Sequence, residues 1–335
     1  MRSCIYGAGS LGTVLGAYIT KNGGQIDLIN RNRAHVEALR TKGAHVTGTT
    51  EMTVPVKALT PDEMTGKYDL IILLTKQIDN VETLTALKPY MSEDCTVCTL
   101  QNGLPEFSVA KVVGESATMG CTVAWGAQLV GPGTAELTSD PASMSFGLGR
   151  MNGVKDARLY EVKKLLELMC PVVIEEDFMG VRWSKLLINA AFSGMSVVTG
   201  GTFGEAAKNK KSRVYVQAII KECIDVACAT GVKLAPVQGK DITKLLDYQG
   251  RVKKRMAYAI IPLLIKKHRD IRASMLQDIE HGKKTEVDCI NGAVCERGRD
   301  AGVPTPVNDK VVEIVHRIEA GELRPGFDNL RFFGV

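Results

Sequence analysis

The sequence has no apolar run long enough to cross a membrane. Its longest such run, residues 257–265, is interrupted by Pro262 and falls well short of the ~20 residues that a membrane-spanning helix needs. Met1, Arg2 and Ser3 lead directly into the first apolar segment, so no secretory leader is expected. With 45% hydrophobic and 24% charged residues, the chain is predicted to be a globular, cytoplasmic protein without a membrane partner.

Aromatic residues are scarce, at 5% of the chain. Basic clusters occur at residues 208–213, 251–255 and 266–269, but aromatic side chains are not interleaved with them as in many nucleic-acid-binding surfaces. The net charge of +5 is mild. We therefore interpret the clusters as solvated helix faces and expect no nucleic-acid partner.

The cysteines do not form a recognisable framework. There are nine, an odd number, and Cys95 and Cys98 have C-x-x-C spacing without a second pair. They lie within a β-branched run, which favours reduced, buried thiols over a zinc or redox site. No metal site is expected.

The first apolar segment leads into a glycine-spaced turn, and apolar residues with helical spacing follow it. This G-x-G-x-x-G spacing between strand and helix is typical of a dinucleotide-binding loop. Gly7 permits the tight turn, Gly9 has no Cβ to keep a pyrophosphate away, and Gly12 lets helix and strand pack closely. A glycine-rich turn without a ligand is the alternative. The predicted cofactor contacts are Gly7, Ala8, Gly9, Ser10, Leu11 and Gly12.

The second predicted strand, residues 25–30, ends without an acidic residue. NAD sites usually place a carboxylate there, about 20 residues past the glycines, to bind the ribose 2′-hydroxyl. Here Arg31 follows the strand, and an arginine can hold a 2′-phosphate with two hydrogen bonds. The alternative is a helix start with exposed arginines. We predict NADPH/NADP as the cofactor, with Arg31 as a ligand.

Strands and helices alternate over the first half of the chain. Continuous apolar runs at residues 68–75 and 95–100 are typical of strands covered on both faces. Lys76 and Asn102 follow these runs, at the strand ends where open α/β sheets bind ligands; a turn residue is the alternative for Asn102. Shorter β-like pieces between residues 117 and 149 should extend the sheet in antiparallel fashion.

Beyond residue 178 the pattern is almost entirely helical. We therefore predict two domains: an α/β N-terminal Rossmann-like domain with a mostly parallel sheet, followed by an all-α C-terminal domain. The first, residues 1–177, should bind NADP. The second, residues 178–335, should bind the substrate and carry the catalytic residues.

A polar stripe runs along a helix predicted from about residue 182. The helix is apolar nearly all round, so it should be buried. Lys185, Asn189 and Ser193 nevertheless recur every four residues, which places them on one face. The stripe faces either solvent or a ligand cleft, and the spacing alone leaves both open.

Residues 274–292 form a third informative stretch, with Ser274 at its start and Glu286 inside it. Thr285 and Asp288 have the spacing of a helix capping box. In that case Glu286 is simply a favourable acid in a first helical turn.

Together these stretches resemble the ketopantoate reductases (2-dehydropantoate 2-reductases). The resemblance runs nearly end to end and begins with the glycine turn. It also includes the Lys76 strand end, LQNG at residues 100–103, WSKL at 183–186, residues 274–292 and GVPTP at 302–306.

The resemblance implies an NADP-dependent oxidoreductase that acts on CH–OH groups. Its reaction would reduce a 2-oxo acid to a 2-hydroxy acid, here 2-dehydropantoate to pantoate in pantothenate and coenzyme A biosynthesis. It implies that Lys185 protonates the carbonyl oxygen during hydride transfer, and that Lys76 and Asn102 lie near the nicotinamide and the phosphates.

The resemblance also implies a set of substrate-binding residues, with Glu286 on the substrate hydroxyl and Asp278 supporting that segment. Glu222 matches a family acid to which we assign no direct role. The implied substrate contacts are Asn102, Asn189, Ser193, Ser274 and Glu286.

One position departs from the family pattern. Ser193 stands where the family usually carries a second asparagine, and a serine offers one hydroxyl in place of an amide's donors and acceptor. The chain also carries extra charged sequence around residues 240–269. Both features leave the acyl part of the substrate open.

Two other functions fit part of the sequence. Opine-type or 3-hydroxyacid dehydrogenases typically use a catalytic histidine, but the five here lie at charged or polar positions outside the motifs: His35, His45, His268, His281 and His316. A non-catalytic NADP-binding protein would have no reason to keep Lys185 and Glu286 together with the other polar residues. The expected partner is a small 2-oxo acid, and a homodimer is compatible with the sequence.

Overall fold

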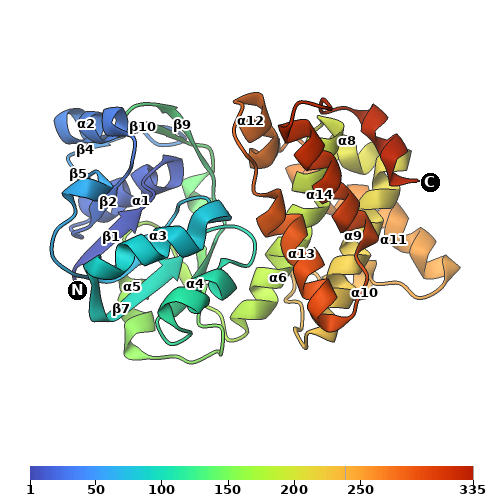
Figure 1. The fold of residues 1–335 in the computed structure, drawn as a ribbon, viewed down its shortest axis with the longest axis horizontal. Helices are drawn as coiled ribbons and strands as arrows, with labels where there is room; N and C mark the ends of the chain where they lie inside the picture. Colours follow the sequence, from blue (N-terminus) through green and yellow to red (C-terminus); the bar gives the residue numbers. More distant parts are fainter. Residues whose placement is uncertain (238, 335) are drawn as a thin grey trace. The chain divides into compact units, whose positions relative to one another are not determined.

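The computed structural model describes residues 1–237 and 239–334, and the chain separates into two compact units (Figure 1). The first comprises Met1–Gln101 and Pro105–Phe178; the second comprises Asn102–Leu104 and the chain from Met179 onward. Strands and helices alternate in the first unit, whereas the second is helical, which confirms the predicted fold class. Over the described residues, the structure contains no helix with both the length and the apolar character to cross a membrane.

An eight-stranded sheet forms the centre of the first unit in the described part of the chain. Its strands are β1 (Ser3–Tyr6), β2 (Asp27–Ile29), β5 (Lys57–Leu59), β6 (Tyr68–Leu73), β7 (Met91–Thr99), β8 (Thr118–Val123), β11 (Phe146–Gly149) and β12 (Val172–Ile174). They lie in the order β12-β11-β8-β7-β6-β1-β2-β5. Neighbouring strands from β5 to β8 pair in parallel, β11 pairs antiparallel with β8, and β12 is parallel to β11.

A smaller sheet corrects one prediction. Its strands, in spatial order, are β4 (Met52–Val54), β3 (Ala44–Gly48), β10 (Thr134–Leu137) and β9 (Ala127–Gly131). The prediction that the pieces between residues 117 and 149 extend the main sheet in antiparallel fashion is therefore wrong for β9 and β10. The reason lies in packing: Ala135 and Leu137 of β10 are buried in the same apolar cluster as helix α1 (Ser10–Lys21). Of the other two, β8 (Thr118–Val123) joins β7 in parallel, and β11 pairs antiparallel with β8.

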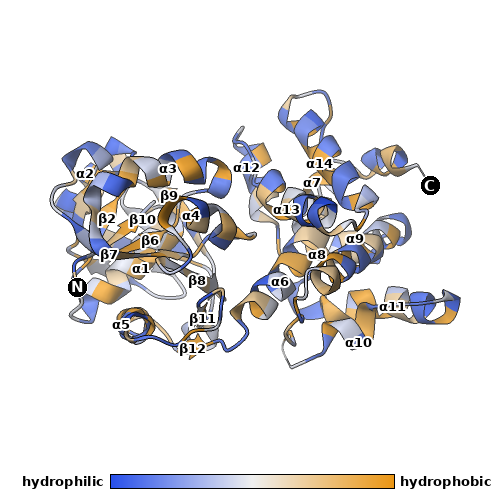
Figure 2. Ribbon diagram, turned by 60° about the horizontal axis from the view of Figure 1, so that its bottom comes forward, coloured by the Kyte–Doolittle hydropathy of each residue, from blue (hydrophilic) through white to orange (hydrophobic). Residues whose placement is uncertain are grey.

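Both faces of the main sheet are covered, as the continuous apolar runs predict. Ile72 and its neighbours on one face belong to a cluster with α1 and α5 (Ala157–Leu166). Ile71 on the other face packs with α3 (Asn80–Leu87) and α4 (Pro105–Val113). Figure 2 shows the apolar character of these strands in orange. Cys95 and Cys98 are free thiols that belong to opposite faces, and burial raises the pKa of Cys95 to about 11.

The second unit is built around its longest described helix, α9 (Lys210–Ala229), on which several other helices pack. Its remaining helices are α6 (Phe178–Asn189), α7 (Met195–Thr199), α8 (Phe203–Lys208), α10 (Ile242–Leu246), α11 (Arg251–Leu264), α12 (Ser274–Glu280), α13 (Val287–Ala301) and α14 (Pro306–Glu319). Glu222 on α9 is buried, and its carboxylate accepts hydrogen bonds from the backbone N–H groups of Val307 (2.9 Å) and Asn308 (3.0 Å). The carboxyl group thus accepts hydrogen bonds from two N–H groups in the first turn of α14, which have no acceptor within the helix.

Candidate functional site

The strand order reverses beside β1, which has β2 on one side and β6 on the other. In open α/β sheets the ligand crevice lies at such a reversal, beyond the carboxyl ends of the strands. The glycine turn follows β1 there, and Lys76 follows β6. The topology therefore places the predicted cofactor loop where this architecture binds ligands.

The three glycines of the loop meet different surroundings. Gly7 has a φ of 96°, and a Cβ added to it would lie 2.5 Å from the backbone nitrogen of Thr75. A Cβ on Gly12 would lie 2.9 Å from Cγ2 of Ile5. A Cβ on Gly9 would instead meet only the Gly7 oxygen, at 4.0 Å. Gly7 and Gly12 are thus required by the fold, whereas Gly9 faces open space.

The open space at Gly9 adjoins the start of a helix. Gly9 is the N-cap of α1, and the first turn of α1 contains no acidic residue. The first backbone N–H groups of a helix point out of its end and, with the helix dipole, favour an anion. The pyrophosphate of a dinucleotide has the charge and the size for this place. Ser10 and Leu11, whose N–H groups open the helix, are therefore suited to the predicted contacts.

The end of β6 is held beside this loop by a residue that the sequence analysis did not select. Gln101 is buried, and its Nε2 donates hydrogen bonds to the Thr75 carbonyl (2.8 Å) and to Oδ1 of Asn80 (2.7 Å). Thr75 itself touches Gly7. Lys76, the next residue, is exposed. The LQNG motif contained the signal for Gln101, since a glutamine in a buried strand end needs polar partners.

Arg31 lies just past the end of β2 and is exposed. Its charge acts on the end of β1, because burial raises the pKa of Tyr6 and Arg31 opposes that rise. The preceding Asn30 donates a hydrogen bond from Nδ2 to the Ala8 carbonyl (2.8 Å). The structure therefore brings the glycine loop, the Thr75–Lys76 segment and Arg31 to one edge of the first unit.

In the second unit, the polar stripe starts on an α-helix and continues into a π-turn. Lys185 and Asn189 lie on α6 and are partly exposed, whereas Ser193 is buried in the π-turn η5 (Ala190–Gly194). The i→i+5 turn is wider than a turn of α-helix, so Ser193 lies at a different angle about the helix axis than an α-helix would give it. The single polar face expected from the four-residue spacing therefore holds only up to Asn189. Such turns occur frequently at functional sites.

A buried side chain holds the π-turn in place. Asn291 on α13 donates from Nδ2 to the Ala190 carbonyl (3.1 Å) and to Oδ1 of Asn308 (2.9 Å). A Cβ on Gly194 would lie 2.5 Å from Oδ1 of Asn291, so this glycine allows the close approach. Asn291 is a further residue that the sequence analysis did not select as functional.

The elements that carry Ser274 and Glu286 both pack on the π-turn. Ser274 begins α12 and is exposed, and Glu286 directly precedes α13. The expected Thr285–Asp288 capping box is not how α13 begins: the Thr285 hydroxyl accepts its hydrogen bond from the Val287 N–H, at 3.2 Å. The structure therefore brings together the elements bearing Ser193, Ser274 and Glu286, and Asp278 also lies on α12. Asn102 directly follows Gln101 and is half-buried.

The segment around residues 240–269, expected to be extra sequence, forms one wall of a cavity next to α6. The cavity has a volume of about 110 Å³ and is lined mostly by apolar side chains, including Ile188 and Phe192 from the α6 and η5 region and Leu246 and Ile261 from the extra segment. The segment thus contributes helices α10 and α11 to the core of the second unit.

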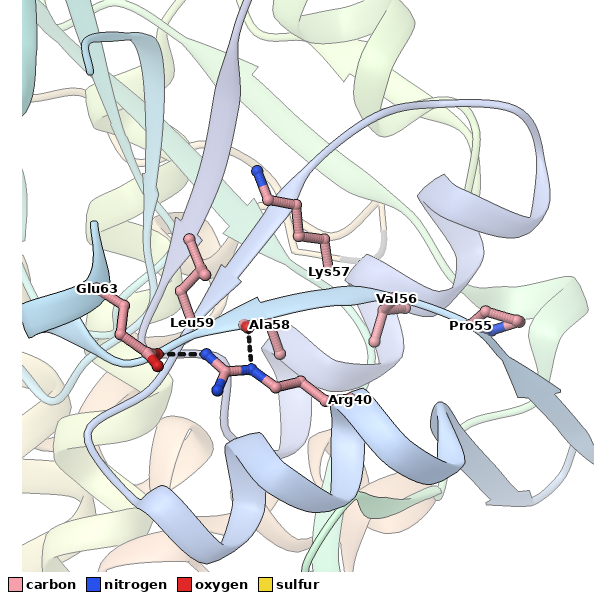
Figure 3. Close-up of a pocket in the computed structure, with 7 residues that line it drawn as sticks. All are labelled: Arg40, Pro55, Val56, Lys57, Ala58, Leu59 and Glu63. Carbon is pink, nitrogen blue, oxygen red and sulfur yellow. Dashed lines mark hydrogen bonds and ion pairs between the residues drawn. The ribbon is translucent and has the colours of Figure 1, made fainter. Parts of the chain in front are cut away.

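A shallow pocket at the edge strand β5 contains none of the predicted residues (Figure 3). There Arg40 donates a hydrogen bond from Nε to the Ala58 carbonyl (2.8 Å) and forms an ion pair with Glu63. The hydrogen bond from Arg40 is the main cause of the lowered pKa of Glu63. We interpret this pocket as a protected sheet edge. The Ala58 carbonyl, which a further strand would need for pairing, already accepts a hydrogen bond from Arg40.

His35 stands at a polar position outside the sequence motifs. It is nevertheless 1% exposed and lies against the glycine loop. Val36 and Leu39 are the other buried residues of α2 (Arg33–Lys42). The spacing of His35 and Leu39, four residues apart on a helix, was a signal for this burial.

Comparison with known proteins identifies relatives of the whole chain. Residues 3–150 match the family described as "Ketopantoate reductase PanE/ApbA", and residues 177–319 match "Ketopantoate reductase PanE/ApbA C terminal". A 2-dehydropantoate 2-reductase of Streptococcus pyogenes serotype M3 is 30% identical over 319 residues, covering 94% of this chain and 97% of the relative. One of Pyrococcus horikoshii is 28% identical, covering 92% and 94%.

Solved structures share the fold. D-mandelate dehydrogenase in a ternary structure with NADH and anilino(oxo)acetate superposes with a TM-score of 0.82 at 24% identity, covering 96% of this chain and 99% of that one. A PanE/ApbA family ketopantoate reductase from Ralstonia eutropha JMP134 gives 0.81 at 23% identity, with the same coverage. The first unit thus has a Rossmann-type fold.

The open space at Gly9 gives a direct prediction. Gly9→Ala should change the free energy of unfolding by no more than about 1 kcal/mol. It should weaken the binding of nicotinamide dinucleotide roughly ten- to a hundred-fold, because the methyl group separates the pyrophosphate from the helix start and charge-assisted hydrogen bonds contribute about 1.5–3 kcal/mol each. Denaturant unfolding and calorimetric titration measure the two effects.

Gly131→Ala is the matched control, because a Cβ there also meets open space but lies in β9, outside the loop. It should leave the affinity unchanged. Native affinity in the Gly9 variant would mean that the dinucleotide does not bind at this loop.

Proposed function

Since the chain belongs to the ketopantoate reductase family, we propose that it reduces a 2-oxo acid to a 2-hydroxy acid with NADPH, and that 2-dehydropantoate is its substrate and pantoate its product. The observation that carries the proposal is the glycine loop at the strand-order reversal, where Gly9 faces open space at the start of α1. Residues 1–177 then serve the cofactor, and residues 178–335 serve the substrate and catalysis.

The residues of the loop fit a dinucleotide, which would supply a hydride from its nicotinamide to the substrate's keto carbon. The N–H groups at the start of α1 would hold the pyrophosphate, and Gly9 would let it approach. Lys76 and Asn102, after β6 and β7, would lie toward the nicotinamide and the phosphates.

Arg31 supports NADPH over NADH. Residues 30–33, directly after β2, read Asn-Arg-Asn-Arg. This stretch therefore has no carboxylate to repel a 2′-phosphate. Arg31 is also exposed, so its guanidinium can reach an incoming ligand. A bidentate arginine–phosphate contact would then distinguish the two cofactors.

Lys185 is the proposed general acid. Hydride arriving at the keto carbon leaves negative charge on the oxygen, and this charge needs a proton or a positive group. The Lys185 ammonium would donate that proton, so the product is the neutral 2-hydroxy group and the lysine is left to regain its proton from solvent. Lys185 is partly exposed on an otherwise largely buried segment of α6, which supports access to a ligand.

Asn189, Ser193, Ser274 and Glu286 are the proposed substrate contacts, with Glu286 on the hydroxyl of the substrate. Ser193 is smaller than the asparagine that the family usually carries at this position, which favours a bulkier acyl group. A larger 2-oxo acid is therefore the second candidate substrate. A neighbour with 17% identity is described as a dimeric ketopantoate reductase, and we propose a homodimer for this chain too.

The test of the function is NADPH oxidation with a panel of 2-oxo acids. The panel holds 2-dehydropantoate, 3-methyl-2-oxobutanoate, phenylglyoxylate and pyruvate, each measured with NADPH and with NADH. We expect the highest kcat/KM with NADPH and 2-dehydropantoate. A preference for phenylglyoxylate would select the second candidate, and no oxidation with any acid would contradict the proposal.

The same assay tests Arg31. Arg31→Ala should reduce the preference for NADPH roughly ten- to a hundred-fold, since it removes a charge-assisted contact of about 1.5–3 kcal/mol. Its rate with NADH should stay close to native. Equal use of both cofactors by the native protein would show that Arg31 does not select the phosphate.

Lys185→Ala should lower the single-turnover rate of reduction roughly 10²–10⁴-fold, the usual contribution of a general acid. NADPH affinity should hardly change, because the glycine loop and Arg31 hold the cofactor. Rapid mixing with saturating NADPH measures these rates.

Lys253→Ala serves as the control, since Lys253 is an exposed helical lysine of the same unit. It should retain the native rate. If the Lys185 variant also kept the native rate, the proton would come from another group.

A further inference from the structure

The buried His35 is connected to the glycine loop by a specific set of hydrogen bonds. Its Nε2 lies 3.0 Å from the Ala8 carbonyl oxygen and 3.1 Å from the Thr13 hydroxyl. Its Nδ1 accepts a hydrogen bond of 3.0 Å from the backbone N–H of Gly133, between β9 and β10. The imidazole therefore joins the second sheet to the loop that starts α1.

These partners determine the protonation state. A backbone N–H can only donate, so Nδ1 must carry a lone pair, and a carbonyl can only accept, so Nε2 must carry the proton. The imidazole is thus neutral, with its proton on Nε2. A second proton would place Nδ1–H against the N–H of Gly133, and one of the contacts would have to break.

Ala8 is the part of the loop that these contacts fix. It is fully buried, its N–H donates to the Ile29 carbonyl (2.9 Å), and its own carbonyl also accepts from Asn30 (2.8 Å). Gly9 and the first turn of α1 follow directly. The orientation of the N–H groups proposed to bind pyrophosphate therefore depends on how the Ala8 peptide is held.

We propose that His35 is a positioning residue for the dinucleotide-binding loop, and that tight cofactor binding requires its neutral form. His35 acts through the Ala8 carbonyl and does not touch the cofactor. The inference rests on the proposed function, in which this loop holds the pyrophosphate. Affinity for the cofactor should consequently fall in acid, when Nδ1–H of the charged imidazole repels the Gly133 N–H and displaces the ring from the Ala8 carbonyl.

The direction of the pH effect follows from burial. Burial lowers the pKa of His35, and the hydrogen bond to Ala8 partly opposes this change. A histidine whose pKa is lowered on folding stabilises the folded state fully above the reference pKa of ~6.5. This stabilisation is lost as the pH falls through the lowered pKa. The loss should therefore lie on the acid side of ~6.5.

Charged groups on the surrounding elements do not account for this change, whose causes are burial and the bond to Ala8. Besides His35, the titratable and charged side chains on α1, α2, β3, β5 and β10 are Tyr18, Lys21, Arg33, Glu37, Arg40, Lys42, His45, Lys57 and Glu136, and Arg31 lies two residues before α2.

Two substitutions each keep the hydrogen-bonding group of only one imidazole nitrogen. In His35→Gln the amide nitrogen reaches the place of Nε2 and can donate to Ala8, but the side chain cannot titrate. In His35→Asn the shorter amide reaches only the place of Nδ1, so it can accept from Gly133 but leaves Ala8 without this donor. A residue that merely filled space would not distinguish these variants.

The experiment is calorimetric titration of NADP⁺ into the full-length native protein and both variants, from about pH 8 to about pH 5, the range in which histidine charges. Near pH 8 we expect His35→Gln to bind within about three-fold of native and His35→Asn roughly ten-fold more weakly. Toward pH 5 the native protein should lose roughly ten-fold more affinity than His35→Gln. The 2′-phosphate titrates in the same range but affects all three proteins alike.

A second titration needs only the native protein, in case a variant does not fold. NAD⁺ lacks the 2′-phosphate, so its affinity for the native protein should still fall toward pH 5; a flat profile would overturn the inference. Equal acid loss in native protein and a folded His35→Gln would also overturn it, as would native affinity in His35→Asn. If the native protein bound neither dinucleotide near pH 8, the proposed function would fail, and the inference with it.

Discussion

The close approach of Gly7 to Thr75 is the constraint on which the arrangement of the first unit depends. A side chain at Gly7 would lie 2.5 Å from the Thr75 nitrogen, so only glycine lets the turns after β1 and β6 come together. Those two strands meet where the strand order reverses. The contact therefore fixes the start of α1 beside the ends of β6 and β7, and with it the direction in which the first N–H groups of the helix point.

The loop is held by residues from four distant parts of the chain. Asn30 and His35 bind the Ala8 carbonyl, Gly133 binds His35, and Gln101 binds Thr75. The two bonds of His35 are buried, where an unsatisfied polar group would cost about 1–3 kcal/mol. The second unit shows the same principle, since Asn291 satisfies the Ala190 carbonyl of the π-turn. In both units, buried polar side chains fix backbone segments that carry the proposed functional residues.

Local patterns were enough to predict the glycine loop, the buried strands and the helical second half. They were not enough for the second sheet, because β3 and β10 pair although about 90 residues separate them, and short alternating pieces do not specify a partner. Residues 190–194, Ala-Ala-Phe-Ser-Gly, fit an α-helix as well as the π-turn that they form. The roles of Lys185, Asn189, Ser274 and Glu286 came from the family resemblance and remain proposals.

Hydride transfer from nicotinamide to a keto carbon is the central claim, and isotope transfer tests it most directly. NADPH deuterated at the transferable position of C4 would be incubated with 2-dehydropantoate and the protein, and the product analysed by mass spectrometry. The account predicts pantoate that carries deuterium at C2. Pantoate without deuterium, or unchanged 2-dehydropantoate after incubation with the native protein, would contradict it.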